Sequence, residues 1–136
     1  LKQFFKLFSK IFPNIAVYGH ADFNQFLDTN DIDFKRLLSD ILHTSLKSYL
    51  TLCQSLVGFN AKALLDKITV PTLVIEGTND TIFPPDIAEY LHSRIKTSQL
   101  DLIEGANHII VLNNPVELEE SIAEFLKKIN FLPGII

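Results

Sequence analysis

The sequence contains no methionine and no tryptophan, and it has a single cysteine, Cys53. One cysteine cannot form a disulfide within the chain, which favours a reducing compartment such as the cytoplasm. Position 1 is leucine, so we expect the 136 residues to be a truncated piece of a longer gene product. No apolar run approaches the roughly 20 residues needed to span a bilayer, and the start lacks the order of a secretory signal. A membrane-spanning protein is therefore not predicted.

The chain also lacks a basic surplus. It has 12 lysines and arginines against 16 aspartates and glutamates, a net charge of −4, which argues against a nucleic-acid partner. The four histidines, the cysteine and their neighbouring carboxylates show no zinc-like spacing, so neither a metal site nor a cofactor is predicted. Hydrophobic residues make up 47% of the sequence, enough for a packed core and too much for a disordered chain.

Residues 1–68 are predicted to be helical and are rich in phenylalanine. Seven of the eleven phenylalanines lie in the first 34 residues. Within residues 1–12, apolar side chains recur every three or four positions opposite three lysines, which predicts an amphipathic helix that stops at Pro13. Such a helix can lie on a membrane surface or form a lid over an apolar pocket. Three lysines would anchor it weakly, so the lid is the preferred interpretation.

Helical spacing resumes after the polar stretch 28–33, which offers N-caps. It continues from Phe34 to Gly58 as one predicted helix, and Asn60 is expected to cap a short helix that ends at Leu65.

Residues 69–136 follow a different pattern. The apolar runs 72–76 and 99–103 predict two short buried strands, and Pro85 and Pro115 each mark the first turn of a helix. Strand, helix, strand, helix predicts the α/β class with parallel strands. Two parallel strands make a poor sheet on their own, because such sheets usually have more strands and both faces covered. The predicted inner faces of the helices comprise Ile87, Leu91, Ile95, Leu118, Ile122, Phe125, Leu126 and Ile129.

Two polar groups follow the predicted strands. Asp80 lies in the turn after strand 72–76, and His108 lies just after strand 99–103. Catalytic groups gather at the carboxyl ends of parallel strands, so we expect the two side chains to meet, the carboxylate orienting the imidazole. Asp101 and Glu104 flank the second strand and are alternative acids, although neither sits in such a turn. His20, His43 and His92 are predicted to have no chemical role.

The run 65–84, which contains G-T-N-D and ends in proline, resembles the last third of α/β-hydrolases, especially the cap-bearing esterase, lactonase and peroxidase-like branches. The block 102–108, followed by Pro115 and a final helix, resembles the end of the same family. The close match covers residues 61–130. The resemblance implies that Asp80 is the triad acid and His108 the general base, that residues 1–68 belong to the lid, and that 69–136 form the C-terminal part of the core.

The family's nucleophile elbow, G-x-S-x-G, is absent, because no serine here has the flanking glycines that the strained turn requires. In the family order Ser, acid, His, the nucleophile belongs upstream of Leu1, so the chain alone is predicted to be inactive. Relatives often place glutamate five residues after the histidine, whereas this sequence has Asn113.

Two hypotheses follow. In the first, the intact protein is a serine-type hydrolase of an ester, lactone or related carbonyl bond, without a cofactor and with a small hydrophobic ester or acyl substrate. In the second, the chain is a non-catalytic binding or assembly module that self-associates through an exposed sheet edge and its lid helices. Under either, exposed apolar surface predicts that the isolated chain self-associates.

Overall fold

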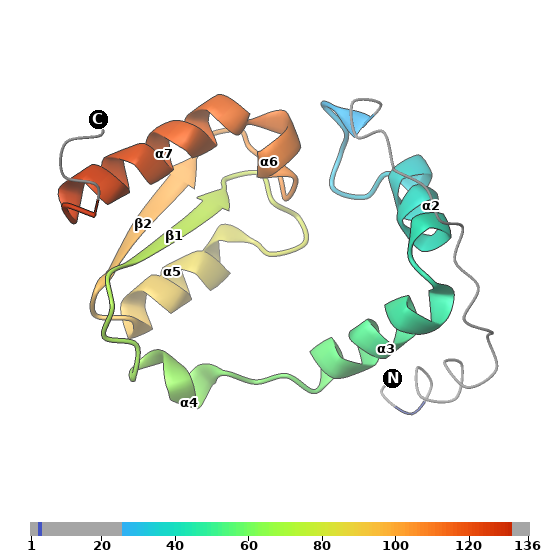
Figure 1. Cartoon of the computed structure of the whole chain (residues 1–136), viewed down its shortest axis with the longest axis horizontal. Helices are drawn as coiled ribbons and strands as arrows, with labels where there is room; N and C mark the ends of the chain where they lie inside the picture. The colour runs from blue at the N-terminus through green and yellow to red at the C-terminus, as the bar shows by residue number, and fades with distance from the viewer. Residues whose placement is uncertain (1–2, 4–25, 132–136) are drawn as a thin grey trace. The chain divides into compact units, whose positions relative to one another are not determined.

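The computed structural model describes residue 3 and residues 26–131 (Figure 1). The amphipathic helix predicted for residues 1–12 lies, apart from residue 3, outside the described residues. The chain divides into two compact units, of which the first contains Ile32–Ala61 and the second contains Leu27–Asp31 and the residues from Lys62 onward.

The first unit contains two helices, α2 (Phe34–His43) and α3 (Leu46–Val57). Asp33 caps α2 by accepting a hydrogen bond from the Arg36 N–H at 2.8 Å. The prediction of one continuous helix up to Gly58 was wrong, because the backbone turns extended at Thr44. The cause lies in Ser45, whose hydroxyl accepts from the Ser48 N–H at 3.1 Å and so begins a new helix.

The second unit is built on a parallel sheet of two strands, β1 (Thr72–Gly77) and β2 (Ser98–Ile103). Their register pairs Thr72 with Ser98 and Gly77 with Ile103, so both strands end at the same edge. The crossover helix α5 (Pro85–Arg94) and the last helix α7 (Pro115–Lys128) lie on opposite sides of the sheet (Figure 1). The predicted strand–helix–strand–helix order is confirmed. Two short helices, α4 (Lys62–Leu65) and α6 (Ile110–Asn113), complete the unit.

Both long helices of this unit begin at proline, as predicted, with Pro85 and Pro115 in the first turn. Their predicted inner faces were partly wrong, because Ile87 and Ile122 are 40% and 41% exposed. The neighbouring small residues Ala88 and Ser121 are the buried positions instead. A small side chain lets a helix approach closely, and each buried position is one residue from the predicted one.

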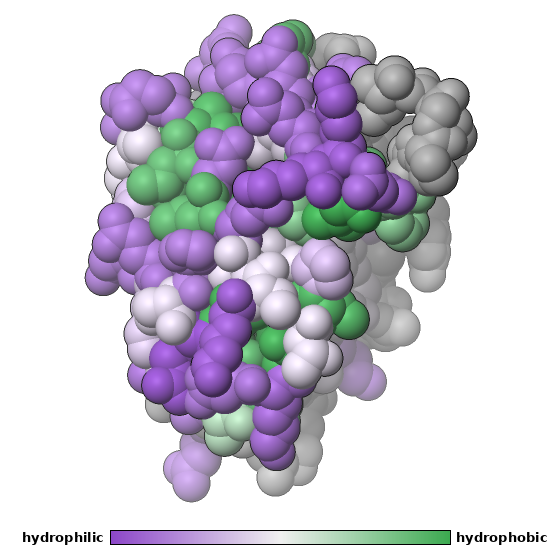
Figure 2. Space-filling view, turned by 90° about the vertical axis from the view of Figure 1, so that its left-hand side faces the viewer, coloured by the Kyte–Doolittle hydropathy of each residue, from purple (hydrophilic) through white to green (hydrophobic). Residues whose placement is uncertain are grey.

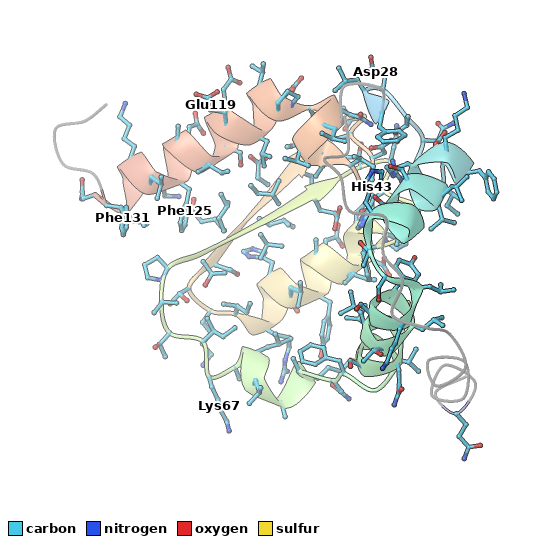
Figure 3. All side chains as sticks on the ribbon, turned by 45° about the vertical axis from the view of Figure 1, so that its right-hand side comes forward. Asp28, His43, Lys67, Glu119, Phe125 and Phe131 are labelled. Atoms are coloured by element: carbon cyan, nitrogen blue, oxygen red, sulfur yellow. The ribbon has the colours of Figure 1, made fainter. Side chains whose placement is uncertain are left out.

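Many large apolar side chains stay exposed on this unit. Figure 2 shows apolar patches between hydrophilic side chains on one face, whereas Lys67 and Glu119 point away from the ribbon in Figure 3. No helix among the described residues combines the length and apolarity needed to cross a bilayer. The most exposed apolar residues of α6, α7 and the segment after α7 are Val111, Val116, Ile122 and Phe131.

Candidate active site

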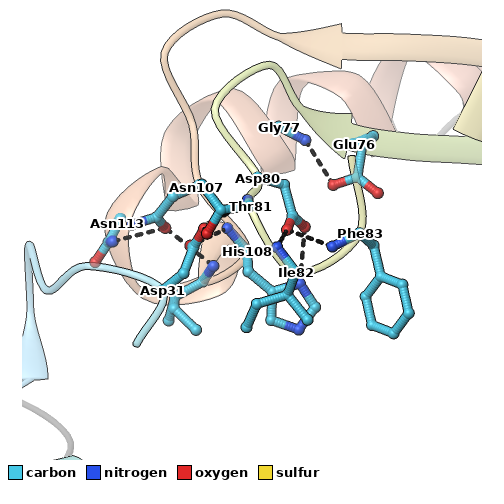
Figure 4. A network of polar contacts seen from close by, with 11 residues as sticks. Asp31, Glu76, Gly77, Asp80, Thr81, Ile82, Phe83, Asn107, His108 and Asn113 are labelled. Atoms are coloured by element: carbon cyan, nitrogen blue, oxygen red, sulfur yellow. Dashed lines mark hydrogen bonds and ion pairs between the residues drawn. The ribbon is translucent and has the colours of Figure 1, made fainter. Parts of the chain in front are cut away.

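Asp80 and His108, which are 28 positions apart in the sequence, meet at the edge where both strands end (Figure 4). His108 Nδ1 lies 2.7 Å from Asp80 Oδ2. Among the described contacts, no ion pair joins His108 to either alternative acid, since Asp101 lies inside β2 and Glu104 is exposed. The structure therefore brings together the acid and the histidine expected from the sequence.

The Asp80 carboxylate is 1% exposed and fully engaged. Its Oδ1 accepts hydrogen bonds from the backbone N–H groups of Ile82 and Phe83, both at 2.7 Å, while Oδ2 faces His108. Burial raises the pKa of Asp80, but the hydrogen bonds from Phe83, His108 and Ile82 outweigh it and hold the pKa below its ordinary value. Asp80 is thus a fixed, ionised acceptor.

The imidazole of His108 remains accessible, with 34% of its side chain exposed. Because the Asp80 carboxylate accepts the Nδ1 proton, the neutral tautomer leaves Nε2 with its lone pair available to take up a proton. The Phe83 ring packs beside it, with ring centroids 5.4 Å apart and planes tilted by 44°. This geometry is that of a general base oriented by a carboxylate.

Backbone contacts join the two loops that carry these side chains. The N–H of Thr78 donates to the Ile103 carbonyl at 3.1 Å, and the N–H of Asn79 donates to the Ala106 carbonyl at 2.8 Å. In return, the Gly105 N–H donates to the Thr78 hydroxyl at 2.8 Å. Gly105 has φ of 73°, the left-handed region that favours glycine. The loops therefore form one connected support for the acid and the base.

A third segment reaches the site from far upstream, and the sequence reasoning missed its role. Asp31 accepts hydrogen bonds from the Thr81 N–H at 2.7 Å and its hydroxyl at 2.6 Å, and from the His108 N–H at 2.7 Å (Figure 4). The carbonyl of Thr29 accepts from the side-chain amide of Asn107 at 2.8 Å. The polar stretch 28–33 was interpreted only as a source of helix caps, a role that Asp33 fills.

Asn113, noted as a departure from the family pattern, anchors that same segment. Its Nδ2 donates to the Thr29 carbonyl and to Asn107 Oδ1, both at 3.0 Å, while its Oδ1 accepts from the Asp28 N–H at 2.9 Å. Only an amide both donates and accepts in this way, since an ionised glutamate carries no donor. The asparagine therefore suits a structural role between the site and residues 28–29.

A second carboxyl group, Glu76, stands at the end of β1 beside Asp80. Its Oε1 accepts from the Gly77 N–H at 2.9 Å. Burial raises the pKa of Glu76, the Gly77 N–H lowers it, and the Asp80 carboxylate raises it again, leaving the pKa above its ordinary value of 4.5. Nothing in the sequence pattern distinguished this glutamate from other strand residues.

Glu76→Gln is expected to stabilise the protein at neutral pH and not in acid. A raised folded-state pKa means that Glu76 favours folding below about pH 4.5 and that this contribution is lost as pH rises through the folded value. Glutamine keeps an acceptor for Gly77 and adds a donor toward Asp80. We expect a gain of about 1 kcal/mol at pH 7.5, the size of one net hydrogen bond.

Urea unfolding at pH 4 and at pH 7.5 measures this difference. The exposed Glu104, which follows β2 as Glu76 ends β1, supplies the control Glu104→Gln, for which we expect no pH-dependent gain. Equal effects of Glu76→Gln at both pH values would contradict this assignment.

The other histidines are occupied elsewhere. His43 Nδ1 lies 2.8 Å from the Ser39 carbonyl, and His92 Nδ1 lies 2.9 Å from the Ser98 hydroxyl. His20 lies outside the described residues. Within the part of the chain that the structure covers, no three histidine, cysteine or carboxylate side chains form a group able to hold a metal ion.

Comparison with known proteins places this arrangement. No protein-family model matches the chain. Over 93 residues it is 39% identical to a pimeloyl-[acyl-carrier protein] methyl ester esterase of Neisseria meningitidis, a match that covers 66% of this chain and 30% of the relative. Among solved structures, a serine hydrolase involved in carbazole degradation superimposes with a TM-score of 0.58 at 19% identity, covering 93% of this chain and 47% of that one. An esterase from Exiguobacterium antarcticum superimposes with a TM-score of 0.59 at 23% identity, covering 93% and 42%.

The chain belongs to the α/β-hydrolase superfamily. Its two parallel strands with flanking helices form a small part of the sheet typical of that fold, and the predicted fold class is confirmed. The chain spans between 30% and 47% of the length of the three proteins compared.

Proposed function

We propose that the protein is a serine-type hydrolase of carboxylic esters in which Asp80 is the triad acid and His108 the general base. The observation that carries the proposal is the 2.7 Å contact between Asp80 Oδ2 and His108 Nδ1 at the carboxyl ends of neighbouring parallel strands. A buried, ionised carboxylate that orients a partly exposed imidazole is the arrangement that activates a serine hydroxyl. The nucleophile is proposed to be a serine outside residues 1–136, because no serine here lies in G-x-S-x-G.

The chemistry assigns one role to each side chain. His108 Nε2 takes the proton of the serine hydroxyl while the serine oxygen attacks the ester carbonyl carbon. The tetrahedral adduct collapses, the bond to the leaving alcohol breaks, and His108 returns its proton to that alcohol. Water then attacks the acyl-serine with His108 again acting as base, which releases the acid and restores the serine. Asp80 stays ionised throughout and stabilises the imidazolium.

The surroundings of His108 support an apolar acyl group. Ile82 and Phe83, which follow Asp80 directly, leave 41% and 50% of their surface exposed, and Phe83 packs against the His108 ring. Exposed apolar side chains beside a base favour an uncharged substrate group there. The helical residues 1–68 are proposed to be part of a lid over this region. The Neisseria relative is named for a methyl ester of an acyl chain, which agrees with a neutral ester.

Hydrolysis of a series of nitrophenyl esters by the full-length gene product tests this proposal. We expect turnover without added metal or cofactor, and a kcat/KM that rises from acetate to butyrate to octanoate. Each buried methylene contributes about 0.8 kcal/mol, so two added methylenes correspond to roughly a tenfold gain. Absence of turnover from a folded protein would contradict the proposal and favour the assembly-module hypothesis.

A further inference from the structure

Asp31 joins the two loops of the candidate site with one carboxylate. Oδ2 accepts from the N–H and the hydroxyl of Thr81, and Oδ1 accepts from the N–H of His108. Thr81 directly follows Asp80, so Asp31 holds the backbone on both sides of the Asp80–His108 hydrogen bond. We propose that Asp31 is a positioning residue that sets the distance and orientation between Asp80 and His108. This inference rests on the proposed function for its effect on turnover, but not for its effect on geometry.

The electrostatics of Asp31 show that this link costs free energy and is maintained by its donors. Asp31 is 7% exposed. Burial and the negative charge of Asp80 both raise the pKa of Asp31, yet the hydrogen bonds from Thr81 and His108 outweigh them and hold the pKa below its ordinary value. Two carboxylates are thus kept ionised close to each other. The free energy of the three hydrogen bonds compensates their repulsion.

The donor pattern requires a carboxylate rather than any polar group. Three donors converge on two oxygens, and neither oxygen is left to donate. Asparagine has the same shape, but one of its two positions is an NH₂ group. In either orientation, that NH₂ would face at least one backbone N–H. Asp31→Asn therefore leaves buried donors unpaired and pushes one loop away from the other.

The displaced loop carries Asp80 or His108, so the change should reach the catalytic hydrogen bond. A shift of about 1 Å in a reacting group can lower turnover about a hundredfold. We expect Asp31→Asn in the full-length protein to lower kcat by about ten- to a hundredfold with little change in KM. The control is Asp40→Asn, since Asp40 is exposed on α2, and we expect it to leave kcat and KM unchanged.

Nitrogen-15 NMR of the histidine side chains gives a readout that is independent of turnover. In the wild type we expect a downfield Nδ1 proton from His108, hydrogen-bonded to Asp80. Asp31→Asn should shift it upfield and broaden it, whereas Asp40→Asn should not. If Asp31→Asn only lowers the thermal midpoint and leaves both the Nδ1 resonance and kcat unchanged, Asp31 is merely structural and the proposal is overturned.

Two further outcomes are informative. If the Nδ1 resonance shifts as expected but the wild type hydrolyses no ester, the positioning role stands and the proposed function fails. If Asp31→Asn does not fold, Thr81→Val replaces it, because it removes only the hydroxyl donor at 2.6 Å. A smaller upfield shift in Thr81→Val supports the proposal, and an unchanged resonance overturns it.

Discussion

His108→Ala in the full-length protein is expected to reduce kcat/KM for an ester by about four to six orders of magnitude, the range seen when a triad member is removed. Alanine removes the only group whose Nε2 is placed to take the serine proton, and it leaves Asp80 without its imidazole partner. The Asp80 carboxylate keeps its hydrogen bonds from Ile82 and Phe83. The fold should therefore survive and the loss should lie in kcat.

Initial rates with a nitrophenyl ester, together with a circular dichroism melt, measure this effect. The control is His43→Ala, since His43 is exposed at the end of α2 and contacts only the neighbouring Ser39 among its described hydrogen bonds. We expect His43→Ala to keep full activity. If His108→Ala retains more than about a tenth of the wild-type rate, His108 is not the base.

Gly77→Ala is expected to destabilise the protein by about 3 kcal/mol or more, at or beyond the usual range for overpacking. A Cβ on Gly77 would lie 2.3 Å from the carbonyl oxygen and 2.6 Å from the carbonyl carbon of Ala106, and 3.0 Å from the carbonyl oxygen of Asn107. All three atoms belong to the backbone, so no change of rotamer relieves the clash. The loop before His108 would have to move away from β1.

Urea unfolding of the full-length protein measures the loss, with Gly58→Ala as the control. Gly58 caps α3 with φ of −100°, a conformation open to alanine, so we expect a change within about 0.5 kcal/mol. Because the loop displaced by Gly77→Ala carries His108, ester hydrolysis should fall as well. A stability equal to that of Gly58→Ala would show that the two loops do not pack as closely as described.

The strands and the helix starts could be predicted because their signals are local. The apolar runs before Gly77 and Gly105 mark β1 and β2, and Pro85 and Pro115 mark the helices that follow. The break in the predicted helix at Thr44 was missed, since apolar periodicity continues through it and only the Ser45 cap separates the two helices. The burial phase of α5 and α7 was also missed by one residue, because periodicity marks a stripe but not which member approaches the sheet.

The site shows the same limit. Asp80 and His108 follow consecutive strands, so parallel pairing alone brings them to one edge. Asp31 contacts Thr81 and His108 across 50 and 77 positions, and no periodicity or motif links such distant residues. Glu76 was interpreted as a strand residue, and its interaction with Asp80 depends on the strand end in three dimensions. Sequence therefore predicted the acid and the base but not the residues that support them.

The most direct test of the Asp80–His108 assignment is covalent labelling with a fluorophosphonate, which traps a serine only when a base activates it. The full-length wild type and His108→Ala would be labelled side by side and mapped by peptide mass spectrometry. We predict one modified serine in a G-x-S-x-G sequence outside residues 1–136, labelled in the wild type and not in His108→Ala. Labelling of that serine at the same rate in both proteins, or of no serine in an active wild type, would contradict the account.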